Sequence, residues 1–194
     1  MKTIQIVGLG IIVLFYLAHY TKVFLQKRRG ISTVQMGIGE KDHKTIKVEK
    51  YLGLSLTILL ILEILSIVFV KNSMFGQRLV IVGIGMAFIG VIIFVVAMWT
   101  MRDSWRAGIP ANDETELVNV GIYKLSRNPA FLGFDLLYIG ILIAFFNPLL
   151  LVGTSFAIIM IHMQILEEEK FLKSRFQDKY VDYQKKVGRY FLVF

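Results

Sequence analysis

The sequence predicts an all-α polytopic membrane protein with five transmembrane helices, of which the last two form a tight helical hairpin, followed by a C-terminal amphipathic helix. Of the 194 residues, 56% are hydrophobic and only 19% are charged, whereas soluble domains contain about 45–50% apolar and about 25% charged residues. The apolar residues gather in runs of about 20, the length that crosses the hydrocarbon core as a helix. The length fits a single integral membrane domain over residues 1–194.

The first three apolar runs each predict one span. Residues 3–25 are interrupted only by a histidine and a lysine near the end of the run, and this run is too long for a signal peptide. Residues 51–70 contain one charge, Glu63, and residues 79–99 contain none. Because a charge at mid-bilayer costs about 2.5–3.5 kcal/mol on insertion scales, we expect Glu63 to face the interior of the bundle.

Small residues recur every seven positions in the third span, at Gly76, Gly83, Gly90 and Ala97. This spacing places a groove of small side chains along one face of the helix. Small residues allow membrane helices to approach closely. We therefore predict that this face packs against another helix.

The fourth apolar region, residues 131–163, is too long for one span and is divided by Asn147-Pro148. Proline breaks the interior of a helix because it lacks an amide donor. The region is therefore predicted to be a tight hairpin of two rather short spans.

The basic residues predict the orientation of the chain. Eighteen of the 22 lysines and arginines lie in residues 26–50, 101–130 and 164–194. Five spans place all three segments on one side of the membrane, and positive charge accumulates on the cytoplasmic side. We expect the N-terminus outside, the C-terminus inside, and the net charge of +8 to face anionic lipid headgroups rather than nucleic acid.

The chain contains no cysteine. This excludes a disulfide framework, a thiol nucleophile and a cysteine-ligated metal centre, and no metal site is expected. A site in this protein must therefore use carboxylates, basic groups, hydroxyls or amides.

The triplet Arg127-Asn128-Pro129 directly precedes the fourth span. Asn128 suits an N-cap and Pro129 suits the first helical turn, where no amide donor is needed. A helix N-terminus carries free amides and partial positive charge, so it can hold a carboxylate or a phosphate. The alternative is that the triplet simply starts a well-capped helix.

A stripe of residues continues after the fifth span at helical spacing and predicts an amphipathic helix. Its members are Gln164, Glu168, Leu172, Phe176, Tyr180, Tyr183 and Val187. We expect this face to look inward, with Glu168 beside the start of the fourth span. Glu167 and Glu169 are rotated by about 100° from it, and we expect them to be an ordinary charged helix segment.

Together these segments resemble the isoprenylcysteine carboxyl methyltransferase and phospholipid methyltransferase superfamily of integral membrane enzymes, most closely a small prokaryotic isoprenylcysteine carboxyl methyltransferase homologue. The resemblance covers roughly the last 80 residues at ordered spacing. Ser104 to Ile109 also look like small prokaryotic members. The matching residues are Leu117, Val118, Gly121, Tyr123, Arg127, Pro129, Gly133, Glu168, Glu169, Leu172, Phe176, Tyr180, Tyr183 and Val187.

The sequence departs from the family pattern at several positions. Asn128 stands where the family has a histidine, and Gln164 stands where prenylcysteine enzymes have an arginine for the substrate carboxylate. An asparagine forms hydrogen bonds but does not take up a proton at neutral pH. Asn128 is therefore excluded as a general base and remains available as a cofactor contact.

The resemblance implies S-adenosylmethionine as cofactor, S-adenosylhomocysteine as product, and a lipophilic substrate that enters from the bilayer. It places the cofactor-binding and catalytic half in residues 101–194, at the cytoplasmic face. Glu168 and Arg127 would be the catalytic polar anchors, and Gln164 with Glu168 would bind the substrate. The cofactor would contact Thr115, Glu116, Leu117, Val118, Tyr123, Asn128, Pro129, Ala130 and Phe131.

The favoured activity is methylation of a lipid carboxylate, such as that of a prenylated cysteine, by in-line transfer. N-methylation of phosphatidylethanolamine is the alternative within the same class. A membrane reductase of the sterol type that binds NADPH, and a small transporter that uses Glu63 and Asp135 as an ion site, are the alternatives outside it.

Overall fold

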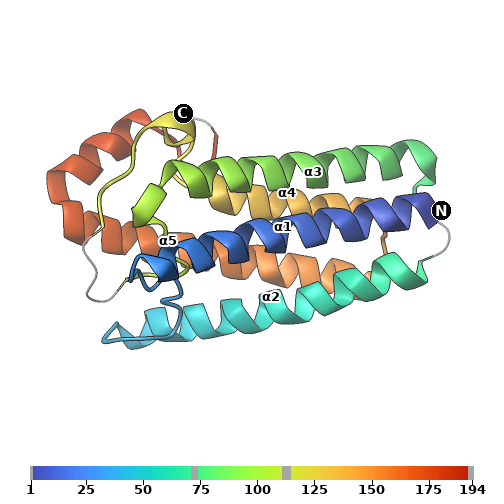
Figure 1. Ribbon diagram of the computed structural model, residues 1–194, viewed down its shortest axis with the longest axis horizontal. Coiled ribbons are helices and arrows are strands. Elements are labelled where there is room, and N and C mark those ends of the chain that lie inside the picture. The colour runs from blue at the N-terminus through green and yellow to red at the C-terminus, as the bar shows by residue number, and fades with distance from the viewer. Residues whose placement is uncertain (1, 71–73, 111–114, 192–194) are drawn as a thin grey trace.

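The fold is an elongated bundle of helices in a computed structural model that describes residues 2–70, 74–110 and 115–191. The long helices lie side by side along the length of the molecule (Figure 1). In the described residues between α3 and α4 the chain forms two short 3-10 helices, η1 (Arg102–Ser104) and η2 (Gly121–Lys124). The α-helices of the described residues are α1 (Lys2–Arg28), α2 (His43–Phe69), α3 (Gly76–Thr100), α4 (Pro129–Ala144) and α5 (Pro148–Lys186).

Four of these helices, α1, α2, α3 and α5, are long and apolar enough to cross a membrane. The fifth apolar helix, α4, has 16 residues and is therefore about 24 Å long at 1.5 Å per residue. This is shorter than the hydrocarbon core of about 30 Å. The all-α fold and the order of the apolar helices agree with the sequence prediction, and the architecture is that of a multi-pass membrane protein.

The helices α3 and α4 form the closest pair in the bundle, and glycines make this contact possible. A Cβ atom on Gly83 would lie 2.6 Å from the Gly140 carbonyl oxygen, and one on Gly90 would lie 2.6 Å from the Gly133 carbonyl oxygen. The predicted groove of small residues is therefore confirmed at Gly83 and Gly90. The prediction was wrong for Gly76, which has a φ of +75° and no atom within 4 Å of the position that its Cβ would occupy.

The hairpin between α4 and α5 turns at Asn147-Pro148, as predicted. The Asn147 side chain caps α5 by accepting a hydrogen bond of 3.0 Å from the Leu150 amide. Beyond the turn the structure differs from the prediction, because the last span and the amphipathic segment form one continuous helix of 39 residues. Non-helical backbone occurs only at Gln177 within it, where φ is 46° and the helix bends.

Glu63 is 1% exposed and faces the interior of the bundle, as expected for a charged residue in a span. The described parts of the three basic segments lie at one end of the bundle, which we call the loop end. There α1 and α3 end, α2 and α4 begin, and the last part of α5 extends beyond the other helices (Figure 1).

Candidate active site

A cavity of about 160 Å³ lies at the loop end, between α1, α2, α4, α5 and the segments that connect them. We call it the main cavity. Some of its lining side chains are apolar, among them Leu52, Leu56, Phe131, Phe134 and Ile161. Others are polar, and these are His19, Arg106, Glu116, Tyr123, Arg127, Asn128, Gln164, Glu168, Tyr180 and Tyr183. The main cavity therefore offers both an apolar surface and a small number of polar groups, as sites for amphipathic ligands do.

A second cavity of about 90 Å³ adjoins the main one, and we call it the side cavity. Thr115, Ile109 and Phe171 line it. Glu116 and Glu168 stand in the wall that the two cavities share. Two ligands that occupied the two cavities would therefore meet beside these two carboxylates.

The structure brings the residues predicted from the sequence to this one place. All of them except Thr115 and Pro129 line the main cavity, and Thr115 lines the side cavity. Pro129 begins α4 and is buried beside them without lining either cavity. The predicted cofactor and substrate residues thus form a continuous surface, although they come from residues 115–131 and from α5.

Glu168 and Gln164 lie one turn apart on α5 and contact each other. The Gln164 amide donates a hydrogen bond of 3.0 Å to the Glu168 carboxylate. Gln164 is buried, at 1% exposure, whereas Glu168 is half-buried. The amide therefore fixes the direction of the carboxylate while leaving it at the cavity surface.

Tyr123, on η2 (Gly121–Lys124), also lines the main cavity. Its backbone carbonyl accepts a hydrogen bond from the Tyr183 hydroxyl, which ties η2 to the last part of α5. Burial raises the pKa of the Tyr123 hydroxyl well above its ordinary value, and the nearby negative charge of Glu168 raises it further. Tyr123 is consequently a neutral phenol at physiological pH.

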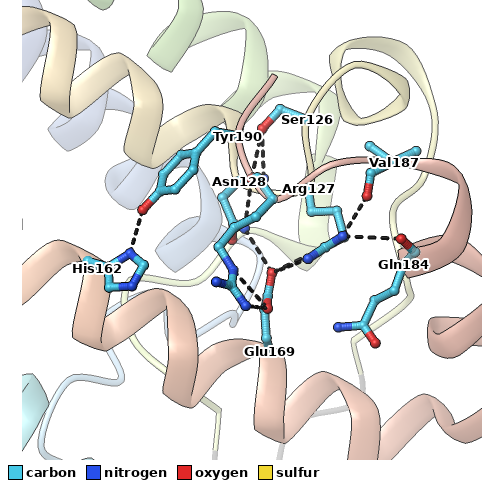
Figure 2. A network of polar contacts seen from close by, with 9 residues as sticks. Ser126, Arg127, Asn128, His162, Glu169, Gln184, Val187 and Tyr190 are labelled. Carbon is cyan, nitrogen blue, oxygen red and sulfur yellow. Dashed lines mark hydrogen bonds and ion pairs between the residues drawn. The ribbon is translucent and has the colours of Figure 1, made fainter. Parts of the chain in front are cut away.

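Arg127 lines the main cavity, but most of its hydrogen bonds hold the protein together. Its Nη2 and Nε atoms donate to one oxygen of Glu169 at 2.9 and 3.1 Å. Its Nη1 donates to the carbonyl oxygens of Val187 and Gln184, at the end of α5 (Figure 2). The structure thus assigns Arg127 a role in joining the start of α4 to the C-terminal segment.

Asn128 occupies the N-cap position of α4, as predicted, but its side chain makes no cap hydrogen bond. The side-chain amide donates instead to Glu169 at 3.3 Å and to the Arg189 carbonyl oxygen at 3.1 Å. Glu169 also receives the Arg189 guanidinium at 2.8 Å, and this hydrogen bond holds the pKa of Arg189 above its ordinary value. Glu169 is therefore the centre of the network shown in Figure 2.

The sequence-based expectation for Glu167 and Glu169 was wrong. Both residues are buried, at 3% and 6% exposure. Glu167 accepts a hydrogen bond of 2.9 Å from the Thr45 hydroxyl and contacts the Lys44 ammonium at 2.8 Å, both at the start of α2. Three successive glutamates on α5 therefore face α2, the cavity and the C-terminal segment in turn.

Part of the cavity wall was missed by reasoning from the sequence. Residues from α1 and α2 line it, as do Met36 and the segment Trp105–Gly108. The only signal in the sequence was the likeness of Ser104 to Ile109 to prokaryotic family members. The contribution of Met36 had no signal, because it depends on a loop that packs against a segment about 70 residues away.

Comparison with known proteins identifies the class of protein that this fold and site define. A family model described as phospholipid methyltransferase matches residues 78–179, a little more than half of the chain. The chain therefore belongs to the phospholipid methyltransferase family, and the resemblance seen in the sequence is confirmed. The match includes nearly all of α3, all of α4, most of α5 and most of the polar residues that line the main cavity.

Two curated relatives are similar to parts of this chain. The protein-S-isoprenylcysteine O-methyltransferase of Saccharomyces cerevisiae is 35% identical over 96 residues, which are 48% of this chain and 40% of that protein. The protein of the same description from Xenopus laevis is 31% identical over 110 residues, which are 55% of this chain and 38% of that protein. The chain thus spans about two fifths of the length of the curated relatives it matches.

Proposed function

We propose that this protein is a membrane methyltransferase that uses S-adenosylmethionine and methylates the carboxylate of a lipophilic acceptor, such as a prenylated cysteine. The observation that carries the proposal is the position of Glu168. Its carboxylate lies in the wall shared by the main and side cavities, on a helix segment that belongs to the family match. A cofactor and an acceptor bound in the two cavities would meet there.

The lining residues fit S-adenosylmethionine. Glu116 offers a carboxylate that would stabilise the ammonium group of the cofactor, and Glu168 offers one that would stabilise its sulfonium charge. Tyr123 and Phe131 offer aromatic faces for a purine ring. When bound, the cofactor supplies an electrophilic methyl group, so the protein needs no nucleophile of its own.

The residues of the chain then act mainly by positioning. A terminal carboxylate has a pKa of about 3.3–3.7 and is already ionised at neutral pH, so methylation of its oxygen needs no general base. The Gln164 amide would donate to the carboxylate of the acceptor, Glu168 orients that amide through their hydrogen bond, and the apolar part of the main cavity would receive the hydrocarbon chain. Holding the reacting groups in line contributes several kcal/mol to lowering the barrier.

The proposed topology has five spans, with the N-terminus outside and the loop end in the cytoplasm. The concentration of 18 of the 22 lysines and arginines in the three basic segments supports this orientation. Although α4 has only 16 residues, a short helix is accommodated by local thinning of the bilayer at modest cost. In this orientation the main cavity opens at the cytoplasmic face.

The first test is calorimetric binding of S-adenosylhomocysteine and of NADPH to the protein purified in detergent. We expect S-adenosylhomocysteine to bind and NADPH not to bind. Absence of S-adenosylhomocysteine binding up to millimolar concentration would overturn the proposal. Binding of NADPH alone would favour a sterol-type reductase.

N-methylation of an amine lipid such as phosphatidylethanolamine is the second candidate. It is favoured by the two carboxylates in the shared cavity wall, because an ammonium must lose a proton before it attacks and Glu168 could accept that proton. A methyl-transfer assay with farnesylcysteine analogues and with phosphatidylethanolamine decides between the two acceptors. We expect transfer to the farnesylcysteine analogue.

A further inference from the structure

Glu49 is a fully buried carboxylate near the start of α2, at 0% exposure. One of its oxygens accepts hydrogen bonds from the Gly37 amide and from the Lys41 ammonium, both at 2.7 Å. The other oxygen accepts a hydrogen bond of 2.8 Å from the Ile109 amide. One side chain thus holds two segments of the chain that are about 70 residues apart.

The same two segments are joined directly by backbone hydrogen bonds. The Gln35 amide donates to the Ala107 carbonyl oxygen at 2.8 Å, and the Ala107 amide donates to the Thr33 carbonyl oxygen at 2.9 Å. Val34 and Ala107 form an isolated parallel bridge. Lys41, with a side chain only 4% exposed, also donates to the Gln35 carbonyl oxygen. Glu49 and Lys41 therefore add side-chain hydrogen bonds to the two segments that the backbone bridge already joins.

The joined segments form a wall of the main cavity, whereas Glu49 and Lys41 do not line it. Met36 belongs to the first segment, and Trp105 and Gly108 belong to the second. The fit is close, because a Cβ atom on Gly108 would lie 2.7 Å from the Met36 amide nitrogen. A small displacement of either segment would therefore change the shape of the cavity.

We propose that Glu49 is a positioning residue for methyl transfer, acting through Met36 and Gly108, which line the main cavity where the reactants would bind. This inference rests on the proposed function. Only an acidic side chain presents acceptors on both of its oxygens, so no other residue type satisfies three donors at this point. The Lys41 ammonium balances the buried charge, which would otherwise be costly.

The test compares Glu49→Gln with Glu40→Gln. Glutamine has one acceptor and one donor group, so Glu49→Gln sets an N–H against either the Ile109 amide or the Gly37 and Lys41 donors. Glu40 is exposed and lies in the loop that contains Gly37 and Lys41, which makes it a matched control. We expect Glu49→Gln to lower kcat about 10- to 100-fold, as for a small misplacement of reactants, and Glu40→Gln to leave it unchanged.

A second measurement, of tryptophan fluorescence, tests whether the cavity wall has loosened and needs no ligand. The protein has two tryptophans, and in a Trp99→Phe background the fluorescence comes from Trp105 alone, which is 7% exposed. We expect Glu49→Gln to increase the quenching of Trp105 by acrylamide at least twofold at a temperature where the protein is folded. A merely stabilising role would lower the melting temperature without changing quenching or kcat below it.

The inference requires both changes, so unchanged kcat or unchanged quenching in folded Glu49→Gln would overturn it. If that variant does not fold, the same two measurements are made on Lys41→Met. This variant leaves both backbone donors to Glu49, the Gly37 and Ile109 amides, in place. We expect it to lower kcat about 3- to 10-fold. If the unaltered protein neither binds S-adenosylhomocysteine nor transfers methyl groups, the proposed function fails, whereas increased quenching in Glu49→Gln would still show that Glu49 holds the wall.

Discussion

The Glu169 carboxylate accepts a hydrogen bond of 2.9 Å from the Arg127 guanidinium, although 42 residues separate the two in the sequence. Its second oxygen receives Arg189 at 2.8 Å. A single side chain of α5 thereby holds both the residue before α4 and the segment after α5. This contact supports the polar wall of the main cavity from behind, because Arg127 and Asn128 belong to that wall.

Glu169→Gln should destabilise the protein by about 3 kcal/mol, since removing one partner of a buried charged network leaves the others uncompensated. Glu169 and Arg127 have side chains only 7% and 11% exposed, so solvent cannot replace the lost contact. A denaturant titration in detergent micelles measures the free energy of unfolding. We also expect weaker binding of S-adenosylhomocysteine, because Arg127 and Asn128 lose their common partner.

Asp182→Asn is the matched control for Glu169→Gln. Asp182 pairs with Lys185 at 3.0 Å on the surface, where the two side chains are 64% and 70% exposed. Exposed ion pairs contribute about 0–1 kcal/mol, so the free energy of unfolding should change little. Equal effects of the two substitutions would show that the Glu169 network adds no more stability than a surface pair.

Glu168→Gln should abolish most of the turnover and leave the affinity for S-adenosylhomocysteine nearly unchanged. The glutamine keeps the size of the side chain and a hydrogen bond with Gln164, but it loses the charge in the wall shared by the two cavities. Steady-state kinetics and calorimetry on the same preparation check both parts. Unchanged turnover would show that Glu168 does not contact the reacting groups.

Asn147→Ala should destabilise the hairpin between α4 and α5. The Asn147 side chain accepts a hydrogen bond from the Leu150 amide at 3.0 Å and donates one to the Ser66 hydroxyl at 2.7 Å. Loss of such a cap costs about 1–2 kcal/mol, which a shift in melting temperature would reveal. The exposed Asn119 provides a control, and Asn119→Ala should change stability by less than about 0.5 kcal/mol.

The helices could be predicted because their signals are local. A run of apolar residues, a proline or a run of small residues acts within its own segment, so the starts of α4 and α5 at Pro129 and Pro148 follow from neighbouring residues. The inward stripe on α5 was also visible, and Tyr180, Tyr183 and Val187 do pack together. Local patterns could not show that α5 would continue through the last span into this stripe.

The burial of Glu167 and Glu169 could not be predicted, because their partners lie far away in the sequence. Glu167 meets Thr45 across 122 residues, and periodicity along one helix does not reveal which face another segment will cover. The same limit applies to Glu49, whose donors come from two separate loops. The part of the cavity wall formed by residues 116–131 and by α5 could thus be predicted. The part formed by α1, α2, Met36 and residues 105–108 could not.

Gly90→Ala should destabilise the pair formed by α3 and α4. A Cβ atom on Gly90 would lie 2.6 Å from both the Gly133 carbonyl oxygen and the Leu137 amide nitrogen. These are backbone atoms of a helix and cannot turn aside, so the two helices must separate. Overpacking of this kind costs about 1–3 kcal/mol, and a denaturant titration in micelles measures it.

Gly85→Ala is the control in the same helix, because no atom lies within 4 Å of the position that its Cβ would occupy. Alanine favours a helix over glycine by up to about 1 kcal/mol, so this variant should be as stable as the original protein or more stable. Separation of α3 from α4 would also move the start of α4, where Ala130 and Phe131 line the main cavity. We therefore expect Gly90→Ala, and not Gly85→Ala, to weaken the binding of S-adenosylhomocysteine. Equal stability and equal affinity in the two variants would show that α4 is held in place by contacts other than the glycine interface.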